Sequence, residues 1–264
     1  MKKLVLLLSL TLLTACQPEH SLTKSVVDDT VEEIAGGTKV TRFDSLGKHM
    51  AHIFVPATKT VCTGTIIAPN LILTAAHCIS NPGYPLEIGF GLDWHDGNME
   101  IRAGRAVIKH SGFAGAQSNF DRDDIALISF SGSLPDGFKP APLVKDTTYT
   151  KENGTFTAFG YGSTTGMDGI GNSTGRLRKV PMTIFSVFSN KKVFASKHLS
   201  GKGVCFGDSG GAAFVKIKGV YHLMGVIGGV YWSQRPKDQC SAYSYYLSIP
   251  YYLPWIREKS LQLR

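Results

Sequence analysis

The sequence lacks the high charge content and the repeats that are typical of non-globular proteins. Charged residues make up only 18% of the 264 positions and hydrophobic residues 43%, so a disordered chain and a coiled coil are excluded. No repeat of fixed period occurs, and basic residues are not interleaved with aromatic ones, which argues against a nucleic-acid partner. The 29 glycines and 12 prolines are spread along the chain and favour many short elements joined by tight turns. An all-β fold is therefore expected.

Metal-ligand patterns are also scarce. No histidine pair stands at ligand spacing, and the acids Asp121, Asp123 and Asp124 alone make a poor calcium site. Neither a metal nor another cofactor is therefore expected.

The N-terminus contains a short hydrophobic run. Residues 1–15 begin with Lys2 and Lys3, continue through an apolar stretch at 4–13 and lead into Cys16. This run is too short to span a bilayer and predicts an export signal. Residues 13–16 resemble a bacterial lipobox, which would make Cys16 a lipid-carrying first residue and would anchor the protein in a bacterial envelope. The alternative is a plain cleaved signal with an incidental cysteine.

The chain has only five cysteines. Removing Cys16 leaves four, and an even number in an exported protein predicts two disulfides. Spacing alone leaves all three pairings open.

Residues 16–33 are predicted to form a polar tether. Positions 17–33 hold five acidic residues against one lysine. From Ile34 onward, 25 Lys and Arg residues stand against 15 Asp and Glu residues, a formal charge of +10. This charge favours anionic surroundings and serves solubility and surface adhesion.

Strand-like segments recur along the remaining chain. They are rich in β-branched and apolar residues and separated by turn residues. They cover residues 50–55, 63–67, 101–108, 125–130, 154–159, 179–185, 212–215, 221–226 and 243–249. The end of the chain, about 251–261, predicts a helix, and residues 162–175 predict a surface loop.

Three segments carry reactive residue types. Ser209 stands among glycines at 207–211, where the backbone can approach a substrate closely. His77 follows an apolar strand, and Asp124 directly precedes another. Taken singly, these segments could be a glycine-rich turn, a structural histidine and an acid at a strand start.

Taken together, the three segments resemble the chymotrypsin-like (trypsin-like) serine proteases. They follow in the order His77, Asp124, Ser209, with separations of 47 and 85 residues. The resemblance extends over about residues 34–256 and includes the segments 62–67 and 160–162. It implies a protease domain at 34–264, built from two six-stranded antiparallel β-barrels packed face to face, at about 34–138 and 139–250, with a C-terminal α-helix.

The resemblance also implies a role for each residue. Ser209 would be the nucleophile, His77 the general base and acid, and Asp124 the residue that orients the imidazole. The amides of Gly207 and Ser209 would form the oxyanion hole. Asp121 and Asp123 are expected to be surface acids. The implied disulfides are Cys62–Cys78 and Cys205–Cys240.

Members of this family are made as zymogens and activated by a cut before a segment that Ile34-Ala35-Gly36-Gly37 resembles. The new amino group of Ile34 would then pair with Asp208. Glu33 departs from the Arg or Lys at the cut position of trypsin-activated members, so the activating protease must cut after Glu33 and is not trypsin. Since no disulfide would retain residues 16–33, we expect activation to release the enzyme from the membrane. The alternative is an intact tether.

The resemblance also implies a substrate specificity, from three positions that align with pocket residues of the family. Gly203 stands where an acid would bind Arg or Lys, and Val230 and Ser244 replace pocket glycines, although the alignment of Ser244 allows a slip of one or two residues. A narrowed, uncharged pocket predicts small or medium apolar residues before the cleaved bond (the P1 position), not Arg or Lys.

The expected protein is thus an exported, monomeric serine endopeptidase. Its expected partners are a polypeptide substrate, an activating protease, a proteinaceous inhibitor and, through Cys16, the membrane. The main alternative is a catalytically inactive binding module, such as a pseudoprotease or adhesin, on the same fold. A structural envelope lipoprotein is a third possibility.

Overall fold

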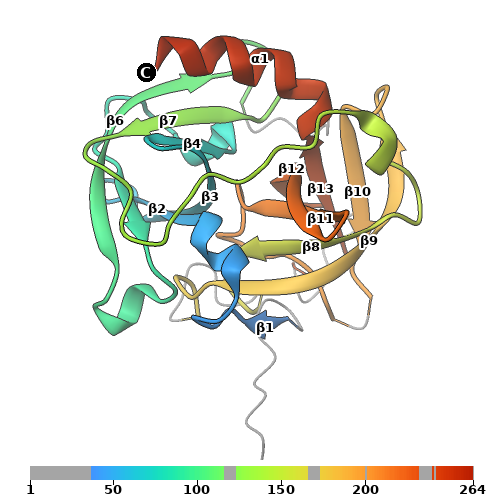
Figure 1. Cartoon of the computed structure of the whole chain (residues 1–264), viewed down its shortest axis with the longest axis horizontal. Helices are drawn as coiled ribbons and strands as arrows, with labels where there is room; N and C mark the ends of the chain where they lie inside the picture. The colour runs from blue at the N-terminus through green and yellow to red at the C-terminus, as the bar shows by residue number, and fades with distance from the viewer. Residues whose placement is uncertain are drawn as a thin grey trace, which may run out of the picture. The chain divides into compact units, whose positions relative to one another are not determined.

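Short β-strands dominate the part of the chain that the structure describes (Figure 1). The computed structural model describes residues 37–115, 123–165, 173–199, 201–231, 240 and 242–263. The expected signal, Cys16, the tether, Ile34 and the acid Asp121 lie outside these ranges. No helix among the described residues is long and apolar enough to cross a membrane.

The first six-stranded unit is a closed antiparallel barrel. Its strands follow the order β2-β3-β4-β7-β6-β5. Alternation along β4 sends Ile72 into this barrel, whereas Leu71 and Leu73 pack on the other face. The strands are β2 (Met50–Val55), β3 (Thr60–Ala68), β4 (Leu71–Thr74), β5 (Glu87–Phe90), β6 (Glu100–Lys109) and β7 (Ala126–Phe130).

The second barrel contains the later strands in the order β9-β10-β13-β12-β11-β8, and the pairing of β8 with β9 closes it. The short strand β1 (Thr38–Lys39) adds to β9 from outside the ring. Aromatic rings fill this core, with Phe194 stacked on Tyr246 and Phe156 packed edge-on against both. The strands are β8 (Thr155–Gly160), β9 (Arg178–Phe188), β10 (Val193–Lys197), β11 (Ala212–Ile217), β12 (Val220–Tyr231) and β13 (Tyr243–Ser248).

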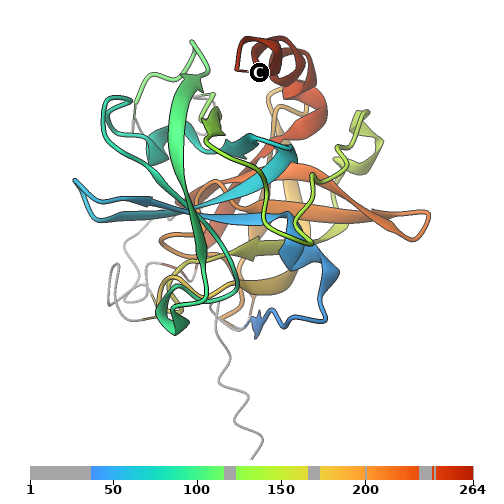
Figure 2. The same ribbon diagram turned by 60° about the vertical axis from the view of Figure 1, so that its left-hand side comes forward.

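A third apolar cluster joins the two barrels. Leu71, Leu73 and Leu127 of the first barrel belong to the same buried cluster as Phe214 and Leu247 of the second. The helix α1 (Ile249–Gln262) adds Ile249, Tyr252 and Ile256 to this cluster and lies outside the sheets (Figure 2). Residues of the two barrels therefore meet across a shared, water-excluding contact.

The expected fold class is confirmed: two closed six-stranded antiparallel barrels and one C-terminal helix. The helix begins at Ile249, two residues before the predicted start, because Pro250 occupies the first turn, where no intrahelical donor is needed. Of the ring strands, β5 and β10 were not anticipated, and β4 was anticipated only as the apolar strand before His77. The remaining ends differ from the predicted ones by a few residues, most in β12, which continues to Tyr231.

Candidate active site

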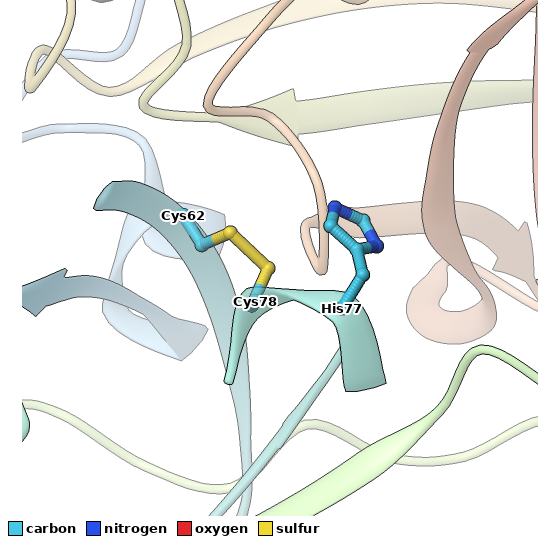
Figure 3. A group of neighbouring side chains, drawn as sticks. All are labelled: Cys62, His77 and Cys78. Carbon is cyan, nitrogen blue, oxygen red and sulfur yellow. A yellow bond between two sulfur atoms is a disulfide. The ribbon is translucent and has the colours of Figure 1, made fainter. Parts of the chain in front are cut away.

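His77 lies on a short 3-10 turn, Ala76–Cys78, directly after β4. The disulfide between Cys62 and Cys78 fastens this turn to β3, with the two Cα atoms 6.1 Å apart. Figure 3 shows the disulfide and the imidazole of His77 projecting from this turn. The two sulfurs and a ring nitrogen lie within 4.8 Å of one another, but the disulfide leaves no thiolate to bind a metal. The disulfide thus braces the turn that carries His77.

Asp124 binds His77 through both carboxylate oxygens. Oδ2 accepts the Nδ1 proton at 2.7 Å, and Oδ1 accepts the backbone N–H of His77 at 2.8 Å. Asp124 is fully buried, whereas the side chain of His77 remains 29% exposed. A carboxylate on Nδ1 fixes the tautomer, so that Nε2 is the nitrogen left to exchange a proton with a substrate-side group.

The chain turns sharply at Asp124. Asp123 has a positive φ of 46°, and the N–H of Ile125 donates to its carbonyl oxygen at 2.7 Å. This turn precedes β7 and directs the Asp124 carboxylate toward His77.

The expectation that Asp123 is a surface acid is wrong. Its side chain is only 17% exposed and accepts hydrogen bonds from Lys192 Nζ at 2.9 Å and from the Tyr252 hydroxyl at 2.8 Å. His110 Nδ1 lies 3.7 Å away. Burial alone would raise the pKa of Asp123, but the bonds from Lys192 and Tyr252 and the charges of His110 and Lys192 lower it overall. Asp123 therefore ties the Asp124 turn to Lys192, in the turn directly before β10, and to α1.

Ser209 is held against the first barrel by its own backbone. The N–H of Thr63, on β3, donates to the Ser209 carbonyl oxygen at 2.9 Å, and the Thr63 hydroxyl donates to the Gly207 carbonyl at 2.9 Å. Cys78 Sγ lies 3.6 Å from the Ser209 carbonyl oxygen. The serine segment of the second barrel thus lies against the turn that carries His77.

Glycine is required beside Ser209. Gly207 and Gly210 adopt positive φ angles of 94° and 82°. A Cβ atom on Gly210 would lie 2.0 Å from the Thr74 hydroxyl and 2.2 Å from the Thr63 carbonyl. Within the described residues, the N–H groups of Gly207 and Ser209 donate to no protein acceptor. These two amides are available to bind a developing negative charge.

Asp208 is buried beneath this segment. Oδ1 accepts the Gly162 N–H and Oδ2 accepts the Cys205 N–H, both at 2.7 Å. Burial raises its pKa to about 6, and these two bonds and the charge of Arg178 oppose the rise. A Cβ on Gly160 or Gly162 would collide with the carboxylate, which explains the glycines of the segment 160–162. Ile34, its expected partner, lies outside the described residues.

Val230 and Ser244 are opposed to each other in the register of β12 and β13. Ser244 is buried, with its hydroxyl 2.9 Å from the Tyr246 hydroxyl. The Cys205–Cys240 disulfide is present, as the resemblance implied.

The surroundings of Gly203 contain a residue that the sequence did not single out. A Cβ atom on Gly203 would lie 2.2 Å from His198 Nδ1, so the imidazole covers this glycine. His198 Nδ1 also hydrogen-bonds the Cys240 carbonyl oxygen. No local pattern marks His198, because its contacts come from segments brought together only by the fold. The same holds for Lys192 and Arg178.

Comparison with known proteins agrees with this geometry. The family model described as Trypsin matches residues 34–256. Kallikrein-11 of Homo sapiens is 28% identical over 220 residues, which cover 76% of this chain and 72% of that protein. Trypsin-1 of Astacus astacus is 25% identical over 215 residues, covering 76% and 88%. Trypsin Blo t 3 of Blomia tropicalis is 27% identical over 285 aligned positions, covering 99% of both chains.

Proposed function

The chain belongs to the trypsin family of serine proteases and is a serine endopeptidase with polypeptide substrates, and we propose that Ser209, His77 and Asp124 carry out its reaction. The observation that carries this assignment is the paired contact between Asp124 and His77, beside a serine segment anchored to β3.

Catalysis begins at Ser209. Its hydroxyl is too weak a nucleophile by itself, so Nε2 of His77 takes its proton as Oγ attacks the carbonyl carbon of the substrate. The buried Asp124 stabilises the resulting imidazolium. His77 then gives the proton to the leaving amine, and an acyl group remains on Ser209. Water, deprotonated by His77, hydrolyses this ester and restores the enzyme.

The tetrahedral intermediates carry a negative oxygen, which the N–H groups of Gly207 and Ser209 bind. Their freedom from protein acceptors, together with the glycine conformations around them, supports this role. Each such donor typically contributes about 100- to 1000-fold in rate.

The P1 side chain enters a pocket formed by Gly203, Val230 and Ser244. Gly203 supplies no carboxylate to pair with an arginine or lysine, and His198 covers it. Val230 narrows the pocket beside Ser244, its partner in the register of β12 and β13. The enzyme therefore prefers small or medium apolar P1 residues and does not cleave after Arg or Lys.

The protein is made as an exported zymogen, lipid-anchored in a bacterial envelope through Cys16. An activating protease other than trypsin cuts after Glu33, and the new amino group of Ile34 pairs with Asp208. The buried, amide-bound carboxylate of Asp208 supports this pairing. The disulfides Cys62–Cys78 and Cys205–Cys240 use all four domain cysteines, so the cut separates the enzyme from its lipid. The active enzyme is a monomer and a target for proteinaceous inhibitors.

Two recombinant proteins test the proposal, one beginning at Ile34 and one at Gln17, each incubated with a mixed peptide library and analysed by mass spectrometry. Ser209→Ala versions are the blank. Cleavage after small apolar residues, stronger with the Ile34 form, is expected. Equal cleavage by both forms contradicts the zymogen. If a folded, disulfide-bonded protein cleaves nothing in either form, it is a binding module. Cell fractionation tests release: an active, Ile34-started enzyme that still carries lipid contradicts it.

A further inference from the structure

A groove of about 410 Å³ lies between one face of α1, the end of β3 and the segment that joins the two barrels. This volume is within the range of small-molecule binding sites in proteins. The groove shares no residue with the proposed triad, the oxyanion hole or the P1 pocket. The proposed function therefore does not account for it.

The walls of the groove are apolar. Six apolar side chains line it: Leu253, Ile256 and Leu261 from α1, and Ile67, Ala68 and Leu143 from the end of β3 and the joining segment. The three on α1 recur at helical spacing and so share one face of the helix. Leu261 is 69% exposed, and the three facing residues are only partly buried. Apolar surface left in contact with water favours an apolar ligand.

Backbone hydrogen bonds hold the joining segment in place. The N–H of Ala141 donates to the Ile66 carbonyl oxygen at 2.8 Å, and that of Val144 donates to the Leu223 carbonyl oxygen at 2.9 Å. The N–H of Leu223 in turn donates to the Pro142 carbonyl oxygen at 2.8 Å. This wall of the groove is thus preformed, so a ligand can bind without first ordering it.

The two charged side chains that line the groove, Lys145 and Arg257, are both positive. Both are exposed, and within the described residues neither forms an ion pair. The acids next to them in the chain are engaged elsewhere. Asp146 accepts a backbone N–H of the turn that follows it at 2.9 Å, and Glu258 pairs with Lys259 at 2.8 Å. An anionic group in the groove would supply both cations with a counter-charge.

The polar groups of the lining distinguish between kinds of ligand. A bound peptide brings backbone N–H groups that need acceptors, whereas Lys145 and Arg257 offer only donors. The Ser260 hydroxyl is buried and donates to the Ile256 carbonyl oxygen at 2.5 Å. A second copy of this chain would bring like charges together. The lining matches a single alkyl chain that carries an anionic head group.

We propose that this groove binds a free long-chain fatty acid. Its carboxylate lies between Lys145 and Arg257, and its alkyl chain follows the apolar walls. The inference goes beyond the proposed function and does not depend on it, because binding requires no peptidase activity.

Isothermal titration of the Gln17-started protein with dodecanoate, below its micelle-forming concentration, tests the proposal. One saturable site per chain is expected. Lys145→Gln and Arg257→Gln should each weaken binding about tenfold, because each removes a charged donor to the carboxylate. Lys259→Gln is the matched control and should change nothing, because Lys259 lies on the same helix but pairs with Glu258 and does not line the groove.

The chain and the charge of the ligand provide a second test. Octanoate, which has a shorter chain, should bind at least about tenfold more weakly, since each buried methylene adds to binding. Dodecyltrimethylammonium, an amphiphile of opposite charge, should show no saturable binding. Leu261→Ser should weaken dodecanoate binding, and its melting temperature should stay close to that of wild type because Leu261 is so exposed.

The proposal is overturned if dodecanoate binds without saturation, if the cationic amphiphile binds as tightly, or if Lys259→Gln acts like the other two substitutions. Binding to phosphatidylglycerol vesicles, with none to monomeric dodecanoate, would indicate a membrane contact and would overturn it as well. The titration gives the same answer whether or not the protein cleaves peptides, so failure of this site and failure of the proposed function are distinguishable.

Discussion

At the scale of single residues, the described glycines with positive φ differ in how tightly they are enclosed. Gly210, beside Ser209, has a φ of 82° and neighbours that leave no room for a Cβ atom. Gly219, between β11 and β12, has a φ of 85° and no atom within 4 Å of a Cβ position.

These two positions form a matched pair. Gly219→Ala should lower the free energy of unfolding by about 1 kcal/mol, because it adds backbone strain alone. Gly210→Ala must also displace the backbone of Thr63 and should cost at least about 3 kcal/mol and abolish peptidase activity. Urea unfolding and a peptide assay measure both effects. Equal costs would contradict the crowding seen around Gly210.

His52 is a second constrained residue. It is 1% exposed, and neither ring nitrogen has a hydrogen-bond partner among the described residues. Its ring stacks on Trp94 at 4.6 Å and meets Tyr161 edge-on at 5.3 Å. Burial, with a smaller contribution from the charge of His95, lowers the pKa of His52 to about 3. The folded protein therefore holds this imidazole neutral well into the acid range.

Acidification should destabilise the protein through His52. Between pH 6.5 and 3 the unfolded chain takes up a proton at His52 that the folded chain rejects, so stability present above pH 6.5 is lost as the pH falls. From pH 7 to 4.5 this loss is about 2 kcal/mol. Urea unfolding of His52→Leu should show a loss smaller by that amount, whereas His222→Leu, at a more exposed histidine, should behave like wild type. An unchanged pH dependence in His52→Leu would refute the assignment.

At the scale of elements, the turn before β7 is fastened to the turn that precedes β10 and to α1. Asp123 accepts hydrogen bonds from Lys192 and Tyr252, and both residues lie in the second half of the chain. Since Asp123 adjoins Asp124, this link steadies the carboxylate that orients His77.

Tyr252→Phe removes one hydrogen bond from this link. It should lower stability at pH 7 by about 1–2 kcal/mol. The lowered pKa of Asp123 means that its stabilising contribution is present above pH 3.8 and disappears as the pH falls below it. The deficit of Tyr252→Phe should therefore shrink at low pH. Tyr251→Phe is the control, because Tyr251 is 44% exposed. Thermal unfolding at pH 7 and pH 3 measures the loss of stability in each variant. A loss in Tyr252→Phe that is the same at both pH values would contradict the role of the Asp123 charge.

The same turn shows how far the sequence predicts the site. The local segments around His77, Asp124 and Ser209 were recognisable because each combines a reactive residue with a neighbouring strand or glycine pattern. The environment of Asp123 could not be predicted, because Tyr252 is 129 residues away in the chain and nothing local marks their contact.

The fold was predictable for a similar reason. Strands with a regular apolar pattern, such as β2 at Met50–Val55, were located to the residue. In β5 (Glu87–Phe90), Gly89 interrupts the apolar pattern, and its pairing with β2 and β6 supplies what local propensity lacks. The contacts of Arg178 and His198 likewise depend on packing between distant segments, so the sequence did not predict them.

At the scale of the whole molecule, Thr63 connects the two barrels. Its hydroxyl donates to Gly207 and accepts the N–H of Tyr161, each at 2.9 Å, and both partners belong to the second half of the chain. Thr65, two residues further along β3, is equally buried, but in the part of the chain that the structure describes its hydroxyl has no hydrogen-bond partner.

Valine substitutions separate the two threonines. Thr63→Val leaves the Gly207 carbonyl and the Tyr161 N–H without this partner. It should lower the free energy of unfolding by about 2–4 kcal/mol and reduce kcat. Thr65→Val removes a buried hydroxyl that is already unpaired and should be neutral or slightly stabilising. Unfolding free energies and peptidase rates measure both. If Thr63→Val proved as harmless as Thr65→Val, the connection between the barrels would not depend on this hydroxyl.

The anchoring of Ser209 on β3 has a consequence for biosynthesis. A chain emerging from the ribosome completes the barrel that carries His77 and Asp124 before Ser209, 85 residues beyond Asp124, has been added. Even then the serine reaches its place only when the second barrel docks on Thr63. A nascent polypeptide therefore lacks the proposed nucleophile Ser209 beside His77 until the second barrel has been made and has docked.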